Sequence, residues 1–139
     1  MDNQYVVELH DVAIYHADDP FGSVSEKRLL QQGEMVLSEV NLAIRPGEFV
    51  YLIGRVGTGK SSLLKTLYAE MQLLTGEGQI AGFNLRKLRR RDIPYLRRRI
   101  GIVFQDYQLL TDRNVFMNLY YVMKATGWKH EHEIRERID

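Results

Sequence analysis

The stretch YLIGRVGTGKSSLLKTL (51–67) constrains the fold of this chain more than any other. Three glycines, a lysine and two serines stand between an apolar run, FVYLI (49–53), and leucines at helical spacing. A fully apolar run of this length is typical of a strand covered on both faces. Leucines three and four residues apart are typical of the buried face of a helix. Strand, glycine loop, helix and a later strand together predict an α/β fold with a parallel sheet.

The loop matches the P-loop pattern G-x-x-x-x-G-K-[ST], in which glycines let backbone N–H groups turn inward around a phosphate. The helix that starts near Lys60 adds the positive end of its dipole at the same point. Lys60 can reach the β- and γ-phosphate oxygens, and the Ser61 hydroxyl can be a Mg²⁺ ligand. We therefore predict that residues 54–62 bind a nucleotide with Mg²⁺. The residues expected to contact it are Gly54, Arg55, Gly57, Thr58, Gly59, Lys60, Ser61 and Ser62.

The rest of the chain alternates between strand-like and helix-like patterns. Strands are predicted at 5–16, 35–44 and, after a turn, within 76–85, with a further buried strand at 100–106. The intervening polar segment 17–34 is predicted to be a loop or an inserted hairpin. Helical spacing continues from Leu63 to Leu74, and RPGE (45–48) is suited to a type II turn. A short basic helix broken near Pro94, a helix at 112–126 stopped by Gly127 and a final helix complete the prediction.

The composition excludes several classes of protein. The chain has 139 residues, enough for one domain, with 45% hydrophobic and 27% charged residues, so a folded globular protein is expected. It has no cysteine, which excludes disulfides and thiolate metal sites. Its N-terminus lacks the pattern of a signal peptide, and its apolar runs are shorter than a membrane span of roughly 18 residues. We expect a soluble chain.

Two segments carry a resemblance to a known family. GRVGTGKSS (54–62) resembles the P-loop of ABC-transporter ATPases, including the additional internal glycine, and RRRIGIVFQD (97–106) resembles their Q-loop segment. Tyr15 falls where the family keeps an aromatic residue that stacks on adenine. LLTDRNVFMNL (109–119) looks most like the members that act in cell division. The resemblance covers nearly the whole chain, from about Val6 to Trp128.

The resemblance implies a fold and a function. The fold would be an ABC-type ATP-binding domain, with a central parallel sheet and an N-terminal antiparallel β subdomain, occupying 1–139 with 17–34 as an inserted loop. ATP and Mg²⁺ would be bound, with Tyr15 against adenine, or His16 or Phe21 in its place. Gln105 would approach Mg²⁺ and the attacking water. The partners would be an integral membrane subunit and a second copy of the ATP-binding subunit, at the cytoplasmic face of the cell membrane.

Other landmarks of the family are absent from these residues. No signature SGG segment occurs, and no apolar strand ends in the Asp-Glu pair of Walker B and the catalytic glutamate. None of the four histidines stands where the family has its switch histidine. We expect residues 1–139 to be the N-terminal part of a longer domain, truncated before the signature and Walker B. The parent would be an ATPase, whereas this stretch would bind ATP without hydrolysing it and would leave the sheet open beside 49–53.

Other functions stay open. The same chemistry could serve an exporter of lipoprotein or macrolide type. RKLRRRDIPYLRRR (86–99), with eight basic residues against Asp92 alone, could bind nucleic acid, contact an anionic membrane surface or form a solvated helical face. A solvated face is expected most and nucleic acid least, because Tyr95 is the only aromatic residue in the block. A non-catalytic nucleotide-binding module is a further alternative.

Overall fold

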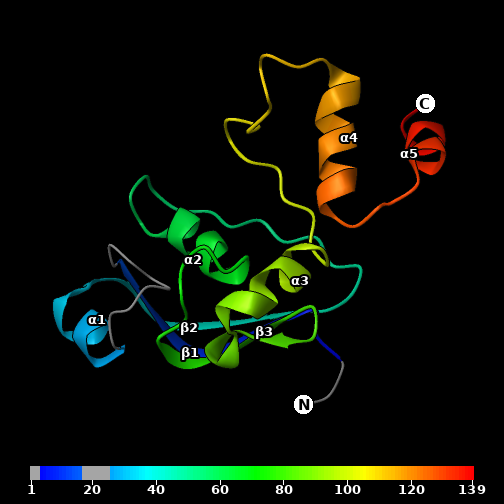
Figure 1. The fold of residues 1–139 in the computed structure, drawn as a ribbon. Coiled ribbons are helices and arrows are strands. Elements are labelled where there is room, and N and C mark those ends of the chain that lie inside the picture. Colours follow the sequence, from blue (N-terminus) through cyan, green and yellow to red (C-terminus); the bar gives the residue numbers. More distant parts are fainter. Residues whose placement is uncertain (1–3, 17–25) are drawn as a thin grey trace. The chain divides into compact units, whose positions relative to one another are not determined.

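The structure is a computed structural model that describes residues 4–16 and 26–139 (Figure 1). The chain forms two compact units, Met1–Ile100 and Gly101–Asp139. All the strands among the described residues belong to the first unit, and the second contains only loops and helices.

The first unit contains a four-stranded antiparallel sheet in the order β2-β1-β3-β4. Its strands are β1 (Val7–His16), β2 (Glu34–Ile44), β3 (Thr75–Ile80) and β4 (Phe83–Asn84). The predicted strands at 5–16, 35–44 and 76–85 and the N-terminal antiparallel β subdomain are therefore confirmed. β3 and β4 are joined by Ala81 and Gly82, both at positive φ (48° and 83°), as in the type I′ turns that favour tight hairpins.

The core of this unit lies against one face of β1. Val7, Leu9, Val12 and Ile14 are buried there, and the step of three from Leu9 to Val12 breaks the usual alternation. A register shift lies between these two residues, where Asp11 has φ of 46°. This bulge keeps the Asp11 side chain out of the core and returns Val12 to it.

Helical segments complete the first unit. They are α1 (Glu26–Gln32), α2 (Lys60–Leu67), the short 3-10 turns Leu85–Lys87 and Arg90–Asp92, and α3 (Ile93–Arg97). α2 and α3 lie over the same face of the sheet (Figure 1), where Leu63 and Leu96 join the core.

Three local predictions are corrected here. Residues 26–32 form a helix rather than a loop or hairpin, and residues 17–25 lie outside the described residues. α2 ends at Leu67, since Ala69 has φ of 56°, so Met71 and Leu74 lie beyond it. Pro94 does not break the basic helix but sits in the first turn of α3, where a missing N–H costs nothing.

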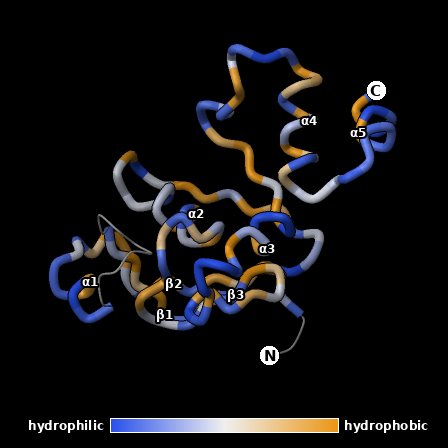
Figure 2. Tube along the Cα trace, viewed as in Figure 1, coloured by the Kyte–Doolittle hydropathy of each residue, from blue (hydrophilic) through white to orange (hydrophobic). Residues whose placement is uncertain are grey.

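The two predicted buried strands, 49–53 and 100–106, do not form. Neither segment is assigned to a strand, and Phe49, Tyr51 and Ile53 are 80%, 77% and 88% exposed. Figure 2 shows 49–53 as a mostly hydrophobic run. A strand requires a neighbour for its N–H and C=O groups, and no strand of the described residues pairs with either segment. The expected parallel sheet is therefore absent from the part of the chain that the structure describes.

The second unit contains α4 (Val115–Ala125) and α5 (Glu131–Ile138). The Asn114 side chain caps α4 by accepting a hydrogen bond from the Met117 N–H at 2.9 Å. The helix stops before Gly127, whose φ is 104°, which confirms the helix predicted at 112–126 and its glycine stop. The Arg135 guanidinium of α5 lies over the Phe116 ring of α4, 5.3 Å from its centroid. Among residues 4–16 and 26–139, no helix has the length and apolar character of a membrane span.

The C-terminal end of α2 is held by polar side chains. The Lys65 ammonium lies 2.8 Å from a Glu70 carboxylate oxygen, and the Tyr68 hydroxyl donates to the other oxygen at 2.7 Å. These two hydrogen bonds lower the pKa of Glu70 below its usual value. Glu70 therefore adds stability at neutral pH that is lost as the pH falls through its lowered pKa.

Part of the basic block 86–99 also has structural partners. The Arg86 guanidinium contacts a Glu26 carboxylate oxygen at 2.6 Å. This contact joins α1 to the 3-10 turn Leu85–Lys87 that follows β4. Arg97 donates from Nε and Nη2 to the carbonyl oxygens of Tyr68 and Ala69, both at 3.1 Å. Both arginines therefore make intramolecular contacts that stabilise the first unit.

The contacts of Arg97 predict a selective loss of stability. Arg97→Ala should lower the free energy of unfolding by about 1 kcal/mol, because two carbonyls beyond α2 lose their donor. Arg99→Ala is the matched control, since the Arg99 side chain makes no polar contact among the described residues, and should change it by less than about 0.5 kcal/mol. Urea denaturation of the 139-residue chain measures both. Equal effects of the two substitutions would contradict a bonding role for Arg97.

Candidate nucleotide-binding site

The glycine loop has the curled backbone that the sequence predicts. Gly57 and Gly59 lie in the left-handed region, with φ of 82° and 84°. Gly59 is also the N-cap of α2, and its carbonyl accepts from the Leu63 N–H at 2.9 Å. The N–H groups of the first helical turn, which have no partner within the helix, therefore follow directly on two left-handed glycines, an arrangement that suits an anion-binding nest.

Lys60 is bound back onto the loop. Its ammonium donates to the carbonyl oxygens of Gly54 at 2.7 Å and Arg55 at 2.5 Å. Thr58 strengthens the same turn, since its hydroxyl donates to the Arg55 carbonyl at 2.8 Å. The positive charge is thereby held within the loop.

The two serines of the motif differ in their surroundings. Ser61 is exposed, so its hydroxyl is open to a cation. Ser62 is only 6% exposed, and its Oγ lies 2.8 Å from Nε2 of His16, at the end of β1. Its carbonyl accepts a hydrogen bond from Thr66 Oγ1 one turn later. Ser62 therefore joins the loop to the sheet.

A hollow of about 400 Å³ opens beside the loop. It is lined by His16, Glu34, Met35, Val36, Gly57, Gly59, Lys60, Ser61 and Ser62. Five of the eight predicted P-loop residues thus share one cavity, while Gly54, Arg55 and Thr58 shape the loop behind it. The lining also includes Glu34, Met35 and Val36 of β2, which could not be predicted from the sequence. No motif in the sequence links these strand residues to the glycine loop.

The aromatic candidates are not equivalent in this cavity. Tyr15 is half-buried and outside the lining, whereas His16, which the sequence left open as its alternative, is part of it. A register shift between Ile14 and Tyr15 changes which side chains of β1 reach the loop. Phe21 lies outside the described residues.

Gln105 lies in the second unit, exposed, in a turn followed by Tyr107 and Gln108 at positive φ. Its predicted role toward Mg²⁺ stays a prediction.

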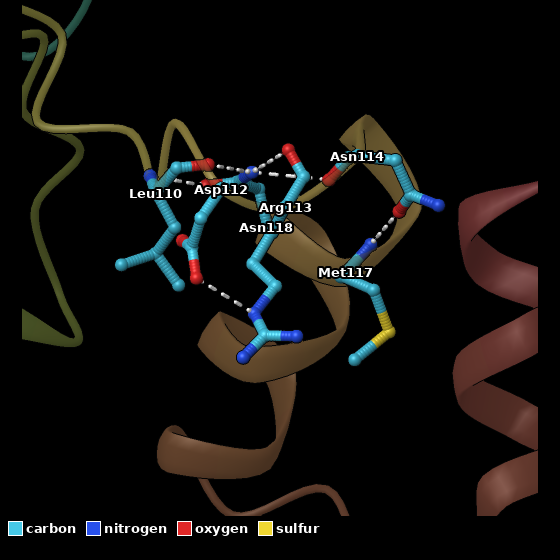
Figure 3. Close-up of polar contacts among 6 residues, drawn as sticks. All are labelled: Leu110, Asp112, Arg113, Asn114, Met117 and Asn118. Carbon is cyan, nitrogen blue, oxygen red and sulfur yellow. Dashed lines mark hydrogen bonds and ion pairs between the residues drawn. The ribbon is translucent and has the colours of Figure 1, made fainter.

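The loop after Gln105 is fastened to α4 by Asn118. Its side-chain oxygen accepts from the Leu110 N–H at 2.8 Å, and its NH₂ group donates to the carbonyls of Leu110 at 3.1 Å and Asn114 at 3.0 Å (Figure 3). One half-buried amide thus satisfies both backbone groups of Leu110. Asn118 belongs to the segment 109–119, but the spacing of residues along the sequence could not predict its hydrogen-bond partners.

The donor set fits a nucleotide with its magnesium ion. Phosphate oxygens accept hydrogen bonds only, and the loop offers backbone amides, the Lys60 ammonium and two serine hydroxyls. An exposed serine hydroxyl is a hard oxygen ligand of the kind Mg²⁺ takes together with phosphate oxygens. No group of three or more His, Cys, Asp or Glu that could hold a metal ion occurs among the described residues.

Fold and loop together define a P-loop nucleotide-binding protein. Residues 37–139 match the ABC transporter family model. The chain therefore belongs to the ABC transporter family and is an ABC-type ATP-binding domain, as the motifs at 54–62 and 97–106 indicate.

The curated relatives are cell-division proteins. The chain is 41% identical over 106 residues to the cell division ATP-binding protein FtsE of Streptococcus pneumoniae, which covers 76% of this chain and 46% of that protein. It is 38% identical to FtsE of Bacillus subtilis, over 68% of this chain and 42% of that protein. It is 36% identical to FtsE of Escherichia coli, over 76% of this chain and 47% of that protein. The chain thus spans about half the length of these relatives.

Solved structures agree on the fold. The ATP-binding cassette MJ0796, in a dimeric post-hydrolysis state bound to ADP and phosphate, matches with a TM-score of 0.74 and 27% identity, over 95% of this chain and 53% of that one. The cassette cbiO1 of Clostridium perfringens, part of an ABC transporter complex, matches with a TM-score of 0.72 and 26% identity, over 97% of this chain and 48% of that one. The predicted ABC-type α/β fold class is confirmed, although its parallel strands do not form in these residues.

The packing of the loop against β2 predicts different costs for two glycine substitutions. A Cβ at Gly59 would lie 2.7 Å from Leu37 Cγ and 2.9 Å from Val36 Cγ1, whereas a Cβ at Gly57 would meet nothing within 4 Å. Both residues have positive φ, so Gly57→Ala should cost about 1–2 kcal/mol of strain alone. Gly59→Ala should cost about 1–3 kcal/mol more, from overpacking. Urea denaturation of both variants tests this, and equal losses would contradict the close contact between loop and β2.

Proposed function

We propose that residues 1–139 carry the nucleotide-binding part of an FtsE-type ATPase, with MgATP bound at 54–62. The observation that carries the proposal is the Lys60 ammonium, held by the carbonyls of Gly54 and Arg55 over a loop with two left-handed glycines. Support also comes from relatives that are 36–41% identical and are named cell division ATP-binding proteins.

Each part of the loop has a proposed role. The backbone amides at 57–62 bind the phosphates, and Lys60 neutralises the charge on the β- and γ-phosphates. Ser61 binds the magnesium ion, which when present neutralises further phosphate charge. Ser62 binds a phosphate beside it, and Tyr15 contacts the adenine. Gln105 keeps its predicted role toward Mg²⁺ and the attacking water.

Hydrolysis and coupling are proposed for the whole protein. Water activation needs a carboxylate that residues 1–139 do not supply, since no Asp-Glu pair follows an apolar strand here. We therefore assign to this stretch ATP binding without turnover. In the whole protein, two ATP-binding subunits would drive an integral membrane subunit of the FtsX type at the cytoplasmic membrane face. The dimeric cassettes among the structural neighbours are consistent with that pairing.

Two of the eight basic residues in 86–99 give the nucleic-acid alternative less support. Arg86 and Arg97, both in the basic block, bind a carboxylate and two carbonyls of the protein itself. Arginines engaged in this way are not available to a line of nucleic-acid phosphates. The export alternative shares the proposed site chemistry and differs only in the membrane partner.

The central role of Lys60 predicts a large and specific loss of binding. Lys60→Ala should abolish measurable binding of a fluorescent ATP analogue by the 139-residue chain, a loss of at least about tenfold, because a charge-assisted contact to phosphate disappears. Lys65→Ala is the matched control, since Lys65 lies on the same helix and its ammonium pairs with Glu70.

Lys65→Ala should bind within about twofold of the wild type once thermal melts confirm that both variants are folded. Binding by the Lys60 variant at wild-type affinity would show that this loop is not the nucleotide site.

A further inference from the structure

We propose that His16 is a positioning residue of the nucleotide site: its Nε2–H donates to Ser62 Oγ, which directs the single hydroxyl proton of Ser62 to a phosphate oxygen of the bound nucleotide. This inference rests on the proposed function and adds to it a residue outside the P-loop.

The geometry brings together two residues that are 46 positions apart. His16 ends β1 and stands opposite Glu34 of β2, while Ser62 lies in the first turn of α2. Their side chains meet at 2.8 Å, and both line the hollow beside the loop. Ser62 is nearly buried, so its hydroxyl has few alternatives to this imidazole.

Counting protons decides the direction of this hydrogen bond in the nucleotide complex. A serine hydroxyl has one proton to donate and lone pairs that accept, and a phosphate oxygen only accepts. If Ser62 donated to Nε2, it would have no proton left for the phosphate. A Ser62 hydroxyl that donates to a phosphate oxygen therefore requires His16 to be the donor, with its proton on Nε2.

Other groups around the pair do not take over this role. The Thr66 hydroxyl bonds to the Ser62 carbonyl rather than to Oγ, at 2.9 Å. The Lys60 ammonium is engaged by the carbonyls of Gly54 and Arg55. Glu34, which pairs with His16 across the strands and also lines the hollow, is an acceptor when ionised and cannot donate to Ser62.

Three substitutions separate this role from stacking on the base. His16→Gln keeps an N–H donor at the end of a side chain of similar reach but removes the ring. His16→Phe keeps the ring but removes the donor. His16→Ala removes both.

The affinity of the 139-residue chain for a fluorescent ATP analogue is the readout, at one fixed pH. His16→Ala and His16→Phe should each weaken binding by about three- to tenfold, the value of one hydrogen bond, and His16→Gln should stay within about twofold of the wild type. In a Ser62→Ala background, His16→Ala should have no further effect. If His16→Phe bound the ATP analogue as tightly as the wild type and His16→Gln bound it more weakly, the result would favour stacking on the base and overturn the proposal. The proposal would also be overturned if His16→Ala weakened binding of the ATP analogue as much in the Ser62→Ala background as it does in the wild type.

A spectroscopic measurement tests the proton directly. In ¹⁵N NMR of the histidine side chains, Nε2 of His16 should be protonated once ATP is bound. His10 is the matched control, because it lies on the same strand, exposed, and contacts Glu8 at 3.0 Å. Its signals should not respond to ATP. A His16 that carries its proton only on Nδ1 in the complex would contradict the proposal.

The outcomes distinguish this inference from the function on which it rests. If the wild-type chain binds ATP and the Lys60→Ala variant does not, the proposed function is supported, whatever the His16 variants show. Failure of the His16 tests in that setting overturns only the positioning role. A wild-type chain that binds no nucleotide overturns both.

Discussion

The contact between the Lys60 ammonium and the carbonyls of Gly54 and Arg55 is the interaction on which the site depends. It closes the loop by joining its first residues to the first turn of α2. The closure requires two left-handed residues in between, and glycine provides both at little cost. A cation bound to carbonyls in this way can exchange them for phosphate oxygens. The loop is therefore closed before a ligand arrives, and the ligand needs to order little of it.

The antiparallel sheet, rather than the expected parallel one, positions this loop in the described residues. Gly59 lies so close to Val36 and Leu37 of β2 that a Cβ there would displace their side chains. His16, at the end of β1, reaches Ser62 from the neighbouring strand. Two strands that contribute no residue to the P-loop motif thus determine where the motif lies and which side chains face its hollow.

Local patterns in the sequence predicted local structure correctly. RPGE forms the predicted turn, with the Arg45 carbonyl accepting from the Glu48 N–H at 3.2 Å and Gly47 at φ of 81°, as in a type II turn. The P-loop, the strands at 5–16 and 35–44, and the glycine stop at Gly127 also follow from a few neighbouring residues. Each of these features is decided by chirality, hydrogen bonding or side-chain alternation within a short segment.

Features that depend on distant residues could not be predicted. The apolar run 49–53 has the composition of a buried strand, but pairing needs a neighbour that composition cannot supply. Tyr15 and His16 could not be told apart, because a register shift beside Ile14 decides which one faces the loop. The four contacts of Asn118 depend on the path of the loop at 110–114, which spacing does not define. The backbone of the glycine loop could be predicted from the sequence, whereas the contacts of Ser62 and Asn118 with distant residues could not.

A crystal structure of the chain with Mg²⁺ and a non-hydrolysable ATP analogue would show whether the Lys60 loop binds the phosphates. We expect the phosphates to lie against the amides of 57–62, with the Lys60 ammonium moved from the carbonyls of Gly54 and Arg55 to a phosphate oxygen. A nucleotide bound elsewhere, with Lys60 still on both carbonyls, would contradict this expectation.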